Sequence, residues 1–270
     1  MDLGLKGKTA IVSGGSKGLG RAIAEELALE GANVVIAARS NGPLDKAVAE
    51  IRAKGGEASG VIADMANEAA VNAAVAFATA TYGAPAIAIA NLDTPDARPG
   101  GSFSVGLEDA TNADFRDAYE TLVMSIVHLS RAVLPVMKER GWGRIVNIGS
   151  KSMKALHAPP TQKILSNVGR LGVVGLMKTL SFEYGKYGIT ANIAATGQFA
   201  TDLARDAYAA RGTTIEAFEE EVMKPTGLGV CRFGRPEEMA ALVAFLCSTR
   251  ASFVSGETIT ITGGMHKSIF

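Results

Sequence analysis

The residues whose types and spacing most clearly indicate a chemical role are the glycines of a loop near the start of the chain. Gly14, Gly18 and Gly20 lie between a β-branched run at 9–12 and a helical pattern at 19–30. Glycines at this spacing permit a tight turn, a close approach of the backbone to a diphosphate, and close packing of a helix on a strand. The free N–H groups and the positive dipole end of the helix favour the anion. The loop therefore predicts a diphosphate-binding site, formed by Gly14, Ser16, Lys17, Gly18, Leu19 and Gly20.

Side chains that bind metals or form disulfides are few. The chain of 270 residues has three histidines, His128, His157 and His266, and two cysteines, Cys231 and Cys247. Their positions lack the spacing of a metal site or of a disulfide framework. The 27 basic and 27 acidic residues give a formal net charge of +0, and no basic cluster indicates nucleic acid or an anionic membrane. We predict no metal, no nucleic-acid partner and a small-molecule substrate.

The chain shows no pattern for export or for membrane insertion. Residues 1–6 lack the apolar segment of a secretion signal. No apolar run reaches the roughly 18 residues that a membrane span needs, and the most apolar stretch, at 84–90, has the length of a strand. We expect a cytoplasmic protein without a membrane partner.

The elements that must position the glycine loop alternate between short strands and longer helices. Predicted strands lie at 9–12, 33–37, 60–63, 86–90, 144–148, 189–194 and 258–261, and predicted helices at 19–30, 44–54, 68–82, about 115–140, 166–184 and 236–248. Such alternation indicates βαβ units on a parallel sheet that is covered on both faces. We predict an α/β fold with a single domain over 1–270, a Rossmann-like doubly wound parallel sheet of about seven strands with helices on both faces.

Two stretches interrupt the alternation, and each follows the carboxyl end of a strand. Residues 93–112 are rich in Pro and Gly, and residues 198–230 form an insertion before the last predicted helix. Within the insertion, Thr213 and Glu216 have the spacing of a capping box, which predicts a short helix. Ligands bind at the carboxyl ends of strands in open α/β sheets. We expect an extended loop at 93–112 and a substrate lid at 198–230, with plain surface excursions as the alternative.

The spacing of Gly14, Gly18 and Gly20 resembles the TGxxxGxG pattern of the short-chain dehydrogenase/reductase family, with Ser13 in place of the threonine. Further segments resemble the family in the same order: GRIVNIGS at 143–150, ITAN at 189–192 with Thr196, Gly197 and Thr201, RFGRPEE at 232–238, and the glycine-rich end at 256–264. The pattern is similar to that of 3-oxoacyl carrier-protein reductases. The resemblance implies coenzyme contacts by Asp64, Met65, Asn91, Ile148, Gly197 and Thr201.

The residues at the end of the second predicted strand bear on the choice of coenzyme. Members that prefer NAD place an acidic residue there for the ribose hydroxyls. This chain instead has Ala38 followed by Arg39, and Lys17 lies in the glycine loop. Two cations without an acid suit a 2′-phosphate, so NADP(H) is the predicted coenzyme. The alternative role for Arg39 is stacking on the adenine.

The catalytic residues depart from the family pattern. Its members use an Asn, a Ser and a Tyr-xxx-Lys pair, but only Ser150 matches here. Alignment on neighbouring segments places Leu122 at the asparagine, Ser166 at the tyrosine and Arg170 at the lysine. Hydride transfer to a carbonyl leaves an alkoxide that needs a proton. A serine hydroxyl is a very poor acid and arginine stays protonated, so the tyrosine-dependent mechanism is not available.

The remaining polar residues suggest replacement roles. Ser150 is predicted to hold the substrate oxygen and Arg170 to bind the coenzyme ribose. Lys154 is the first candidate for the acid, on condition that burial makes its ammonium easier to deprotonate. His157 is the second candidate, and a tyrosine or a water is a further one. The alternative for each is an ordinary loop residue. The predicted catalytic set is Ser150, Lys154, Ser166 and Arg170, with Tyr119 and Tyr208 as outside candidates.

Three glycines on the predicted helix at 166–184, Gly169, Gly172 and Gly175, form a smooth stripe. In the family that this sequence resembles, this helix helps to form the dimer core, which implies a homo-oligomer, either a dimer or a tetramer. The alternative is a contact with the strand layer of the same chain.

The functional prediction is an NADP(H)-dependent oxidoreductase that acts on a carbonyl or hydroxyl of a small, partly apolar substrate with an atypical proton donor. The alternatives on the same fold are lyase, isomerase or dehydratase chemistry without net redox change, and a catalytically silent NADP(H)-binding subunit.

Overall fold

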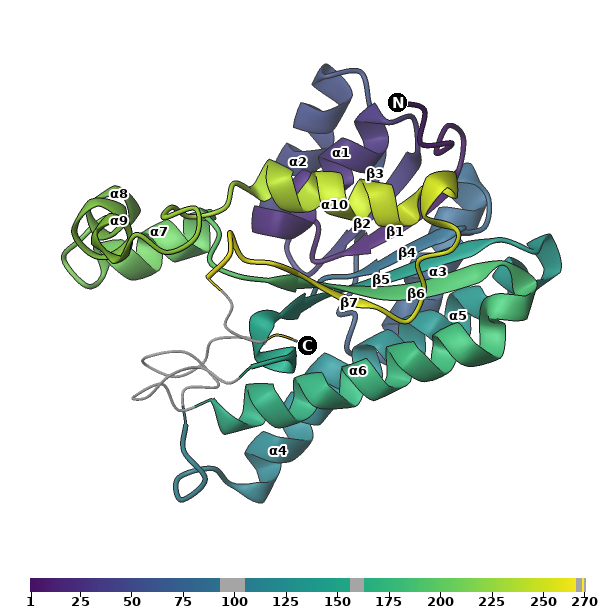
Figure 1. Cartoon of the computed structure of the whole chain (residues 1–270). Helices are drawn as coiled ribbons and strands as arrows, with labels where there is room; N and C mark the ends of the chain where they lie inside the picture. The colour runs from purple at the N-terminus through teal and green to yellow at the C-terminus, as the bar shows by residue number, and fades with distance from the viewer. Residues whose placement is uncertain (93–104, 156–162, 266–268, 270) are drawn as a thin grey trace.

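The computed structural model describes residues 1–92, 105–155, 163–265 and 269. Their centre is a parallel sheet of seven strands in the order β3-β2-β1-β4-β5-β6-β7 (Figure 1). The strands are β1 Thr9–Ser13, β2 Asn33–Ala38, β3 Glu57–Ile62, β4 Ile87–Ala90, β5 Gly143–Ser150, β6 Ile189–Thr196 and β7 Thr258–Ile261. The predicted Rossmann-like doubly wound fold is confirmed.

Helices cover both faces of this sheet. The longer ones are α1 Gly18–Leu29, α2 Asn41–Ala53, α3 Glu68–Tyr82, α5 Ser125–Arg140, α6 Ile164–Tyr184 and α10 Pro236–Cys247. Helices α1, α2 and α10 pack on one face and α3, α5 and α6 on the other (Figure 1). Strand β1 serves both layers, since Ala10 and Val12 join the first core and Ile11 joins the second. Burial on both faces is the reason that inner strands such as β2 and β4 are nearly continuous apolar runs.

The strand order creates the crevice for a ligand. Strand β1 lies between β2 and β4, so the chain winds in one direction from β1 to β3 and in the other from β4 to β7. A crevice forms where the order reverses, beyond the carboxyl ends of β1 and β4. Ser13 and Ala90 end these two strands. The glycine loop and Asn91 follow them directly, so the fold brings both into the crevice.

The long helix predicted at 115–140 is composed of three consecutive pieces. Helix α4, Asn112–Tyr119, continues through a π-helical turn at Glu120–Met124 into α5. The whole stretch of 29 residues is long and apolar enough to cross a membrane. However, 56% of its most apolar window is buried in the protein, where Ile126 and Leu129 belong to the core. It is therefore a core helix of this α/β fold.

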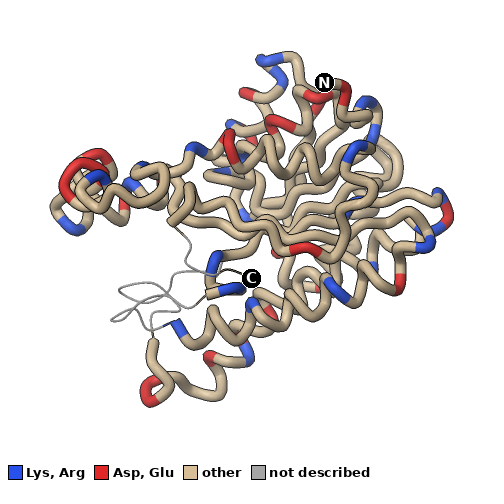
Figure 2. Tube along the Cα trace, in the orientation of Figure 1, with Lys and Arg blue, Asp and Glu red and all other residues tan. Residues whose placement is uncertain are grey.

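The insertion forms an arm that projects from the sheet (Figure 1). It consists of α7 Asp202–Ala209, α8 Ile215–Phe218, a π-helical turn at Glu219–Met223, and α9 Lys224–Thr226. A small core of its own, with buried Ile215, Met223 and Phe233, holds these pieces together. Acidic residues gather at the far end of the arm with basic residues beside them, and both charge signs are interspersed elsewhere (Figure 2).

The predicted capping box in the arm is wrong by one residue. Thr214, rather than Thr213, caps α8, and its hydroxyl accepts a hydrogen bond from the Ala217 N–H at 3.0 Å. Glu216 is therefore the second residue of the helix rather than the third, and its carboxylate pairs with Arg205 of α7 at 2.5 Å. This ion pair links the first two helices of the arm.

Candidate coenzyme and catalytic site

The glycine loop is held in a conformation that side chains would disrupt. Gly14 and Gly18 have φ angles of 61° and 53°, which L-residues adopt at a cost. A Cβ at Gly14 would lie 2.2 Å from the Asn91 carbonyl oxygen, and one at Gly20 would lie 2.2 Å from the Gly14 carbonyl oxygen. The three glycines thus leave a backbone-lined cradle in front of the first turn of α1, as a diphosphate requires.

Asn91 fixes this loop from the neighbouring strand. Its backbone N–H donates to Ser13 Oγ at 2.9 Å, and its side-chain Nδ2 donates to the Gly14 carbonyl at 3.2 Å. The loop is therefore tied to the end of β4 by two hydrogen bonds. Ser13 was not among the predicted site residues, although its place at the end of a buried strand, directly before the loop, was a usable signal.

The end of β2 carries positive charge without an acidic partner. Arg39 follows this strand and is exposed, as is Lys17 at the N-cap of α1. Neither forms an ion pair with the residues that the structure describes. Ser40 caps α2 without a side-chain hydrogen bond, so its hydroxyl is open to another partner. Sequence reasoning missed Ser40, for which the only signal was its position before a helix.

The other predicted coenzyme residues lie at the same edge of the sheet. After β3, Asp64 is exposed and its Oδ1 accepts from the Ala66 N–H at 3.1 Å, while Met65 is buried. Ile148 of β5 is part of the core. Thr201, the N-cap of α7, lies beside the loop, because a Cβ at Gly18 would be 3.6 Å from Thr201 Cγ2.

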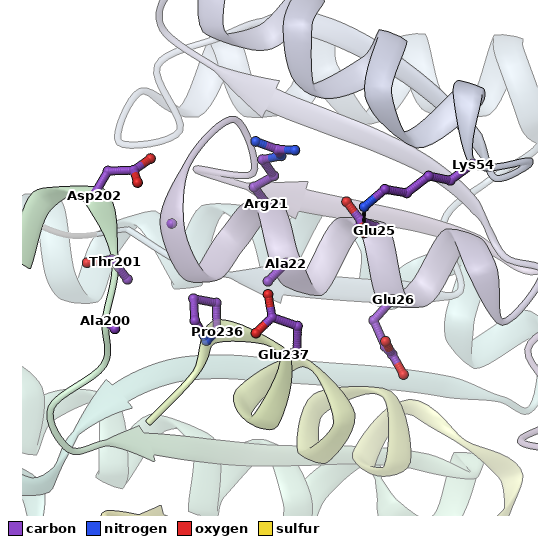
Figure 3. A pocket seen from close by; sticks show the side chains of 11 residues that line it. Arg21, Ala22, Glu25, Glu26, Lys54, Ala200, Thr201, Asp202, Pro236 and Glu237 are labelled. Atoms are coloured by element: carbon purple, nitrogen blue, oxygen red, sulfur yellow. Dashed lines mark hydrogen bonds and ion pairs between the residues drawn. The ribbon is translucent and has the colours of Figure 1, made fainter. Parts of the chain in front are cut away.

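A cavity of about 260 Å³ lies next to the loop. Gly18, Thr201 and Pro236 line it, at the starts of α1, α7 and α10 (Figure 3). Charged residues of α1 form another wall, among them Glu26, whose pKa is raised by burial and then by Glu30 and Glu25. The cavity therefore lies between the glycine loop and the two ends of the arm, near Thr201 and Pro236.

The predicted catalytic serines come from two elements. Ser150 ends β5, and its Oγ accepts from the Ser152 N–H at 3.3 Å. Ser166 lies in the first turn of α6, is 8% exposed, and accepts from Arg170 Nε at 3.1 Å. Arg170 is thus oriented by the residue one turn before it. Gly197 follows β6 and donates to the Ile261 carbonyl at 3.0 Å, and Thr196 Oγ1 donates to the Gly149 carbonyl beside Ser150 at 3.0 Å.

The candidates for the proton donor receive little support from their surroundings. Lys154 is exposed, so the described residues do not provide the burial on which its role as an acid depends. His157 lies outside the described residues. Tyr208 packs against Phe218 and Phe233 inside the arm at centroid distances of 5.1 and 5.6 Å. Burial there raises the Tyr208 pKa, which makes it a weaker acid.

Leu122 packs against α6 at Gly169. It lies in the π-helical turn and is 5% exposed, and a Cβ at Gly169 would be 2.9 Å from Leu122 Cδ1. Gly172 faces Val123 in the same way. The glycine stripe therefore receives a helix of the same chain, and the alternative of a contact with the strand layer is wrong. Gly175 has no atom within 4 Å of its Cβ position and remains open.

Comparison with known proteins gives a consistent picture over the whole chain. Residues 14–266 match a family described as enoyl-(acyl carrier protein) reductase. The chain is 33% identical to the 3-oxoacyl-[acyl-carrier-protein] reductase FabG of Pseudomonas aeruginosa over 98% of its length and 100% of that protein.

Two solved structures are similar to this fold. The L-sorbose reductase of Gluconobacter frateurii, complexed with NADPH and L-sorbose, has a TM-score of 0.87 and 30% identity over 100% of both chains. An NADPH-bound short-chain oxidoreductase of Pseudomonas aeruginosa, described as containing an atypical catalytic center, has a TM-score of 0.85. At 23% identity over 96% of this chain and 97% of that one, it supports the fold alone.

Proposed function

The chain belongs to the short-chain dehydrogenase/reductase family, and on that basis we propose that it is an NADP(H)-dependent oxidoreductase. Its substrate is a small, partly apolar molecule with a carbonyl or hydroxyl group. The observation that carries the proposal is the intact cradle of Gly14, Gly18 and Gly20, held by Asn91. NADPH-bound relatives with the same fold support the coenzyme.

The residues around the cradle fit NADP(H). The loop after Gly14 and the start of α1 would offer N–H groups to the diphosphate, whereas the Gly14 N–H donates to the Ala37 carbonyl. Thr201 lies beside Gly18 of this loop. Lys17 and Arg39, with the Ser40 hydroxyl, provide charge and a donor for the 2′-phosphate. Arg170, which donates to Ser166, is the residue that we propose as the donor to the ribose hydroxyls. When bound, NADPH supplies a hydride. The residues of this chain have to orient the substrate and provide a route for the proton that the substrate oxygen takes up.

The proton is delivered without a tyrosine. Ser150 Oγ accepts one backbone hydrogen bond and retains its own hydrogen, which it donates to the substrate oxygen. Arg170 does not release a proton at neutral pH. The proton donor that we propose is a water, with Lys154 as the alternative, although its exposure does not provide the burial that its role as an acid requires.

The arm supports a lid function over the substrate. It leaves the sheet after β6 and returns to it at α10, next to Thr201 and the cradle. Leu203, Leu228 and Val230 on the arm are exposed apolar residues that fit the apolar part of a substrate. Residues 93–104 of the extended loop predicted at 93–112 lie outside the described residues.

The assembly that we propose is a homo-oligomer formed through α6. This helix exposes Val168 at 54%, Leu171 at 53% and Phe182 at 90%. Together with the open position at Gly175, they make an apolar surface that a second copy can cover. A single domain and a cytoplasmic location remain predictions.

A second candidate is a catalytically silent NADP(H)-binding subunit. The exposed Lys154 and the pairing of Ser166 with Arg170 favour it, because neither arrangement provides an acid of suitable strength.

Coenzyme titration and turnover separate the two candidates. We expect calorimetry to give tighter binding of NADP⁺ than of NAD⁺, and a scan of ketones and aldehydes to detect NADPH oxidation. Loss of turnover in Lys154→Met, with turnover retained in Ser166→Ala, would identify Lys154 as the proton donor. Turnover in both variants would assign the proton to water. Tight NADPH binding without hydride transfer to any carbonyl contradicts the reductase and supports the silent subunit.

A further inference from the structure

A second cavity lies at the edge of the sheet opposite the coenzyme crevice. It has a volume of about 400 Å³, and its polar walls are Lys8, Thr9, Tyr82, Arg140 and Trp142. Thr9 starts β1 and Trp142 precedes β5, whereas the coenzyme cradle follows the other end of β1. The cavity therefore shares no residue with the proposed active site. Its volume lies within the range of about 300–1,000 Å³ that is usual for small-molecule sites.

The charge of this cavity is positive and unneutralised. Lys8 and Arg140 are its cations, and no Asp or Glu lines it. Neither of the two forms an ion pair with any residue that the structure describes. The Lys8 ammonium makes no hydrogen bond to the described residues either, and it rests 4.1 Å from the centre of the Trp142 ring. A cation held on an aromatic ring without a carboxylate is available to an anion.

The backbone carbonyls near the end of α3 do not need the Lys8 ammonium as a hydrogen-bond donor. Helix α3 ends at Tyr82, and Thr9 Oγ1 already donates to the Tyr82 carbonyl at 2.9 Å. Arg140 Nη1 donates to the Ala84 carbonyl at 2.7 Å, which anchors the guanidinium and leaves its other N–H groups. Lys8 is not needed at either carbonyl. Among the described contacts, the Lys8 ammonium therefore touches only the Trp142 ring and has no hydrogen-bond or ion-pair partner.

Trp142 restricts the kind of ligand. Besides Lys8, the buried Arg144 stacks on the ring, with Cζ 4.3 Å from the ring centre. Arg144 itself is occupied, since it donates to the carbonyls of Gly143, Gly188 and Ser248. Because the indole already engages two cations, a ligand would be recognised by charge and hydrogen bonds rather than by stacking.

We propose that this cavity is a second ligand site, in which Lys8 and Arg140 bind the phosphate or carboxylate group of a small anionic metabolite. The site is separate from the active site, so it is expected to bind its ligand in the presence of coenzyme. The shared chemistry of the ligand is an oxyanion that accepts charge-assisted hydrogen bonds from an ammonium and a guanidinium.

The test uses Trp142, which is the only tryptophan of the chain and therefore the only source of indole fluorescence. The full-length protein is saturated with NADP⁺, to fill any phosphate subsite of the coenzyme. It is then titrated with inorganic phosphate, with citrate, and with sodium chloride at matched ionic strength. We expect a saturable change in fluorescence and a rise in the melting temperature with phosphate or citrate, and neither with chloride. The anion that binds more tightly identifies the source of the oxyanion.

Variants assign the response to the cavity. Lys8→Met and Arg140→Met should each weaken binding about 10-fold, as expected for the loss of a hydrogen bond to a charged group. Lys6→Met, two residues away and outside the cavity, is the matched control and should bind as the unchanged protein does. Arg140 is exposed, so its variant tests the site even if Lys8→Met folds poorly. An equal response to chloride, or unaltered binding in both cavity variants, overturns the proposal.

Discussion

The coenzyme half and the catalytic half of the crevice differ in the kind of group on which their function depends. At the ends of β1 and β4, the coenzyme cradle depends on backbone geometry: three glycines and an asparagine that bonds to the loop. At the end of β5 and the start of α6, the chemistry depends on single side chains. Ser150 lies there, and so do Ser166 and Arg170, which are bonded to each other and which we propose to stand at the positions of the family's tyrosine and lysine.

The contrast shows that binding and proton transfer are separable in this fold. A cradle made of backbone tolerates no added Cβ, so any change there affects binding directly. A side chain that donates a proton can be replaced while the helix that carries it stays in place. Helix α6 packs on the π-helical turn through Gly169, whichever residues stand at 166 and 170.

The largest effect is expected when the catalytic half is returned to the family pattern. Ser166→Tyr combined with Arg170→Lys restores a phenol beside an ammonium, and NADPH oxidation with a ketone substrate should rise about 100-fold, a usual gain from general acid catalysis. The matched control is Ser166→Phe with Arg170→Lys, which has the ring without the hydroxyl. No difference between the two double variants would mean that the pocket is not built for reduction.

The next effect concerns the coenzyme half. In Gly14→Ala, the new Cβ would meet the Asn91 carbonyl at 2.2 Å, at a φ of 61°. We expect the NADP⁺ dissociation constant to rise about 10- to 100-fold, which corresponds to the strain of such a residue. Calorimetry measures it, and circular dichroism checks that the fold persists. Gly42→Ala, with no atom within 4 Å of its Cβ, is the control. Equal binding by both variants would contradict the role of the cradle.

A smaller effect is expected at the 2′-phosphate. Arg39→Ala should weaken NADPH about 10-fold, because it removes a charge-assisted hydrogen bond. Binding of NADH should be unchanged, since it lacks the phosphate. Arg131→Ala, an exposed arginine on α5, is the control. If both coenzymes weakened equally in Arg39→Ala, the side chain would be stacking on the adenine instead.

The smallest effect is expected in the arm, at an ion pair whose removal tests whether the arm is independent of the coenzyme half and the catalytic half of the crevice. Where the arm joins α10, Arg232 donates to the Glu238 carboxylate at 2.6 and 2.9 Å. This interaction is the main reason that the pKa of Glu238 is lowered from 4.5 to about 2. The ionised form is thus favoured in the folded protein. Its contribution to stability is present above about pH 4.5 and is lost as the pH falls towards 2.

Glu238→Gln should therefore lower the melting temperature by about 1–3 °C at pH 7, the range for an exposed ion pair. The difference from the unchanged protein should disappear on acidification through that interval, in scanning calorimetry at several pH values. Glu237→Gln, its exposed neighbour, should have no such profile. NADP⁺ binding should be unaltered, and a loss of affinity in Glu238→Gln would mean that the arm and the cradle are coupled.

Much of the fold could be predicted because buried parallel strands and amphipathic helices have strong patterns. The helix at 68–82 and the strand at 258–261 have the predicted bounds. Other details depend on a single residue or turn. Periodicity does not reveal the extra residue of the π-helical turn at Glu120–Met124, and two adjacent threonines do not tell which of them caps α8.

The sequence by itself predicted the coenzyme loop, and it is also the basis for proposing that the family's tyrosine and lysine are replaced. Glycines at this spacing after a strand are required by the close approach of the backbone to a diphosphate. The residue type at an aligned position can be read directly from the sequence. Only the tertiary structure decided that Lys154 is exposed, that Ser166 bonds to Arg170, and that Gly169 receives Leu122. It alone brought Lys8 and Arg140 to one cavity. Burial and charge at a site come from residues distant in the chain, and their meeting depends on how the layers pack.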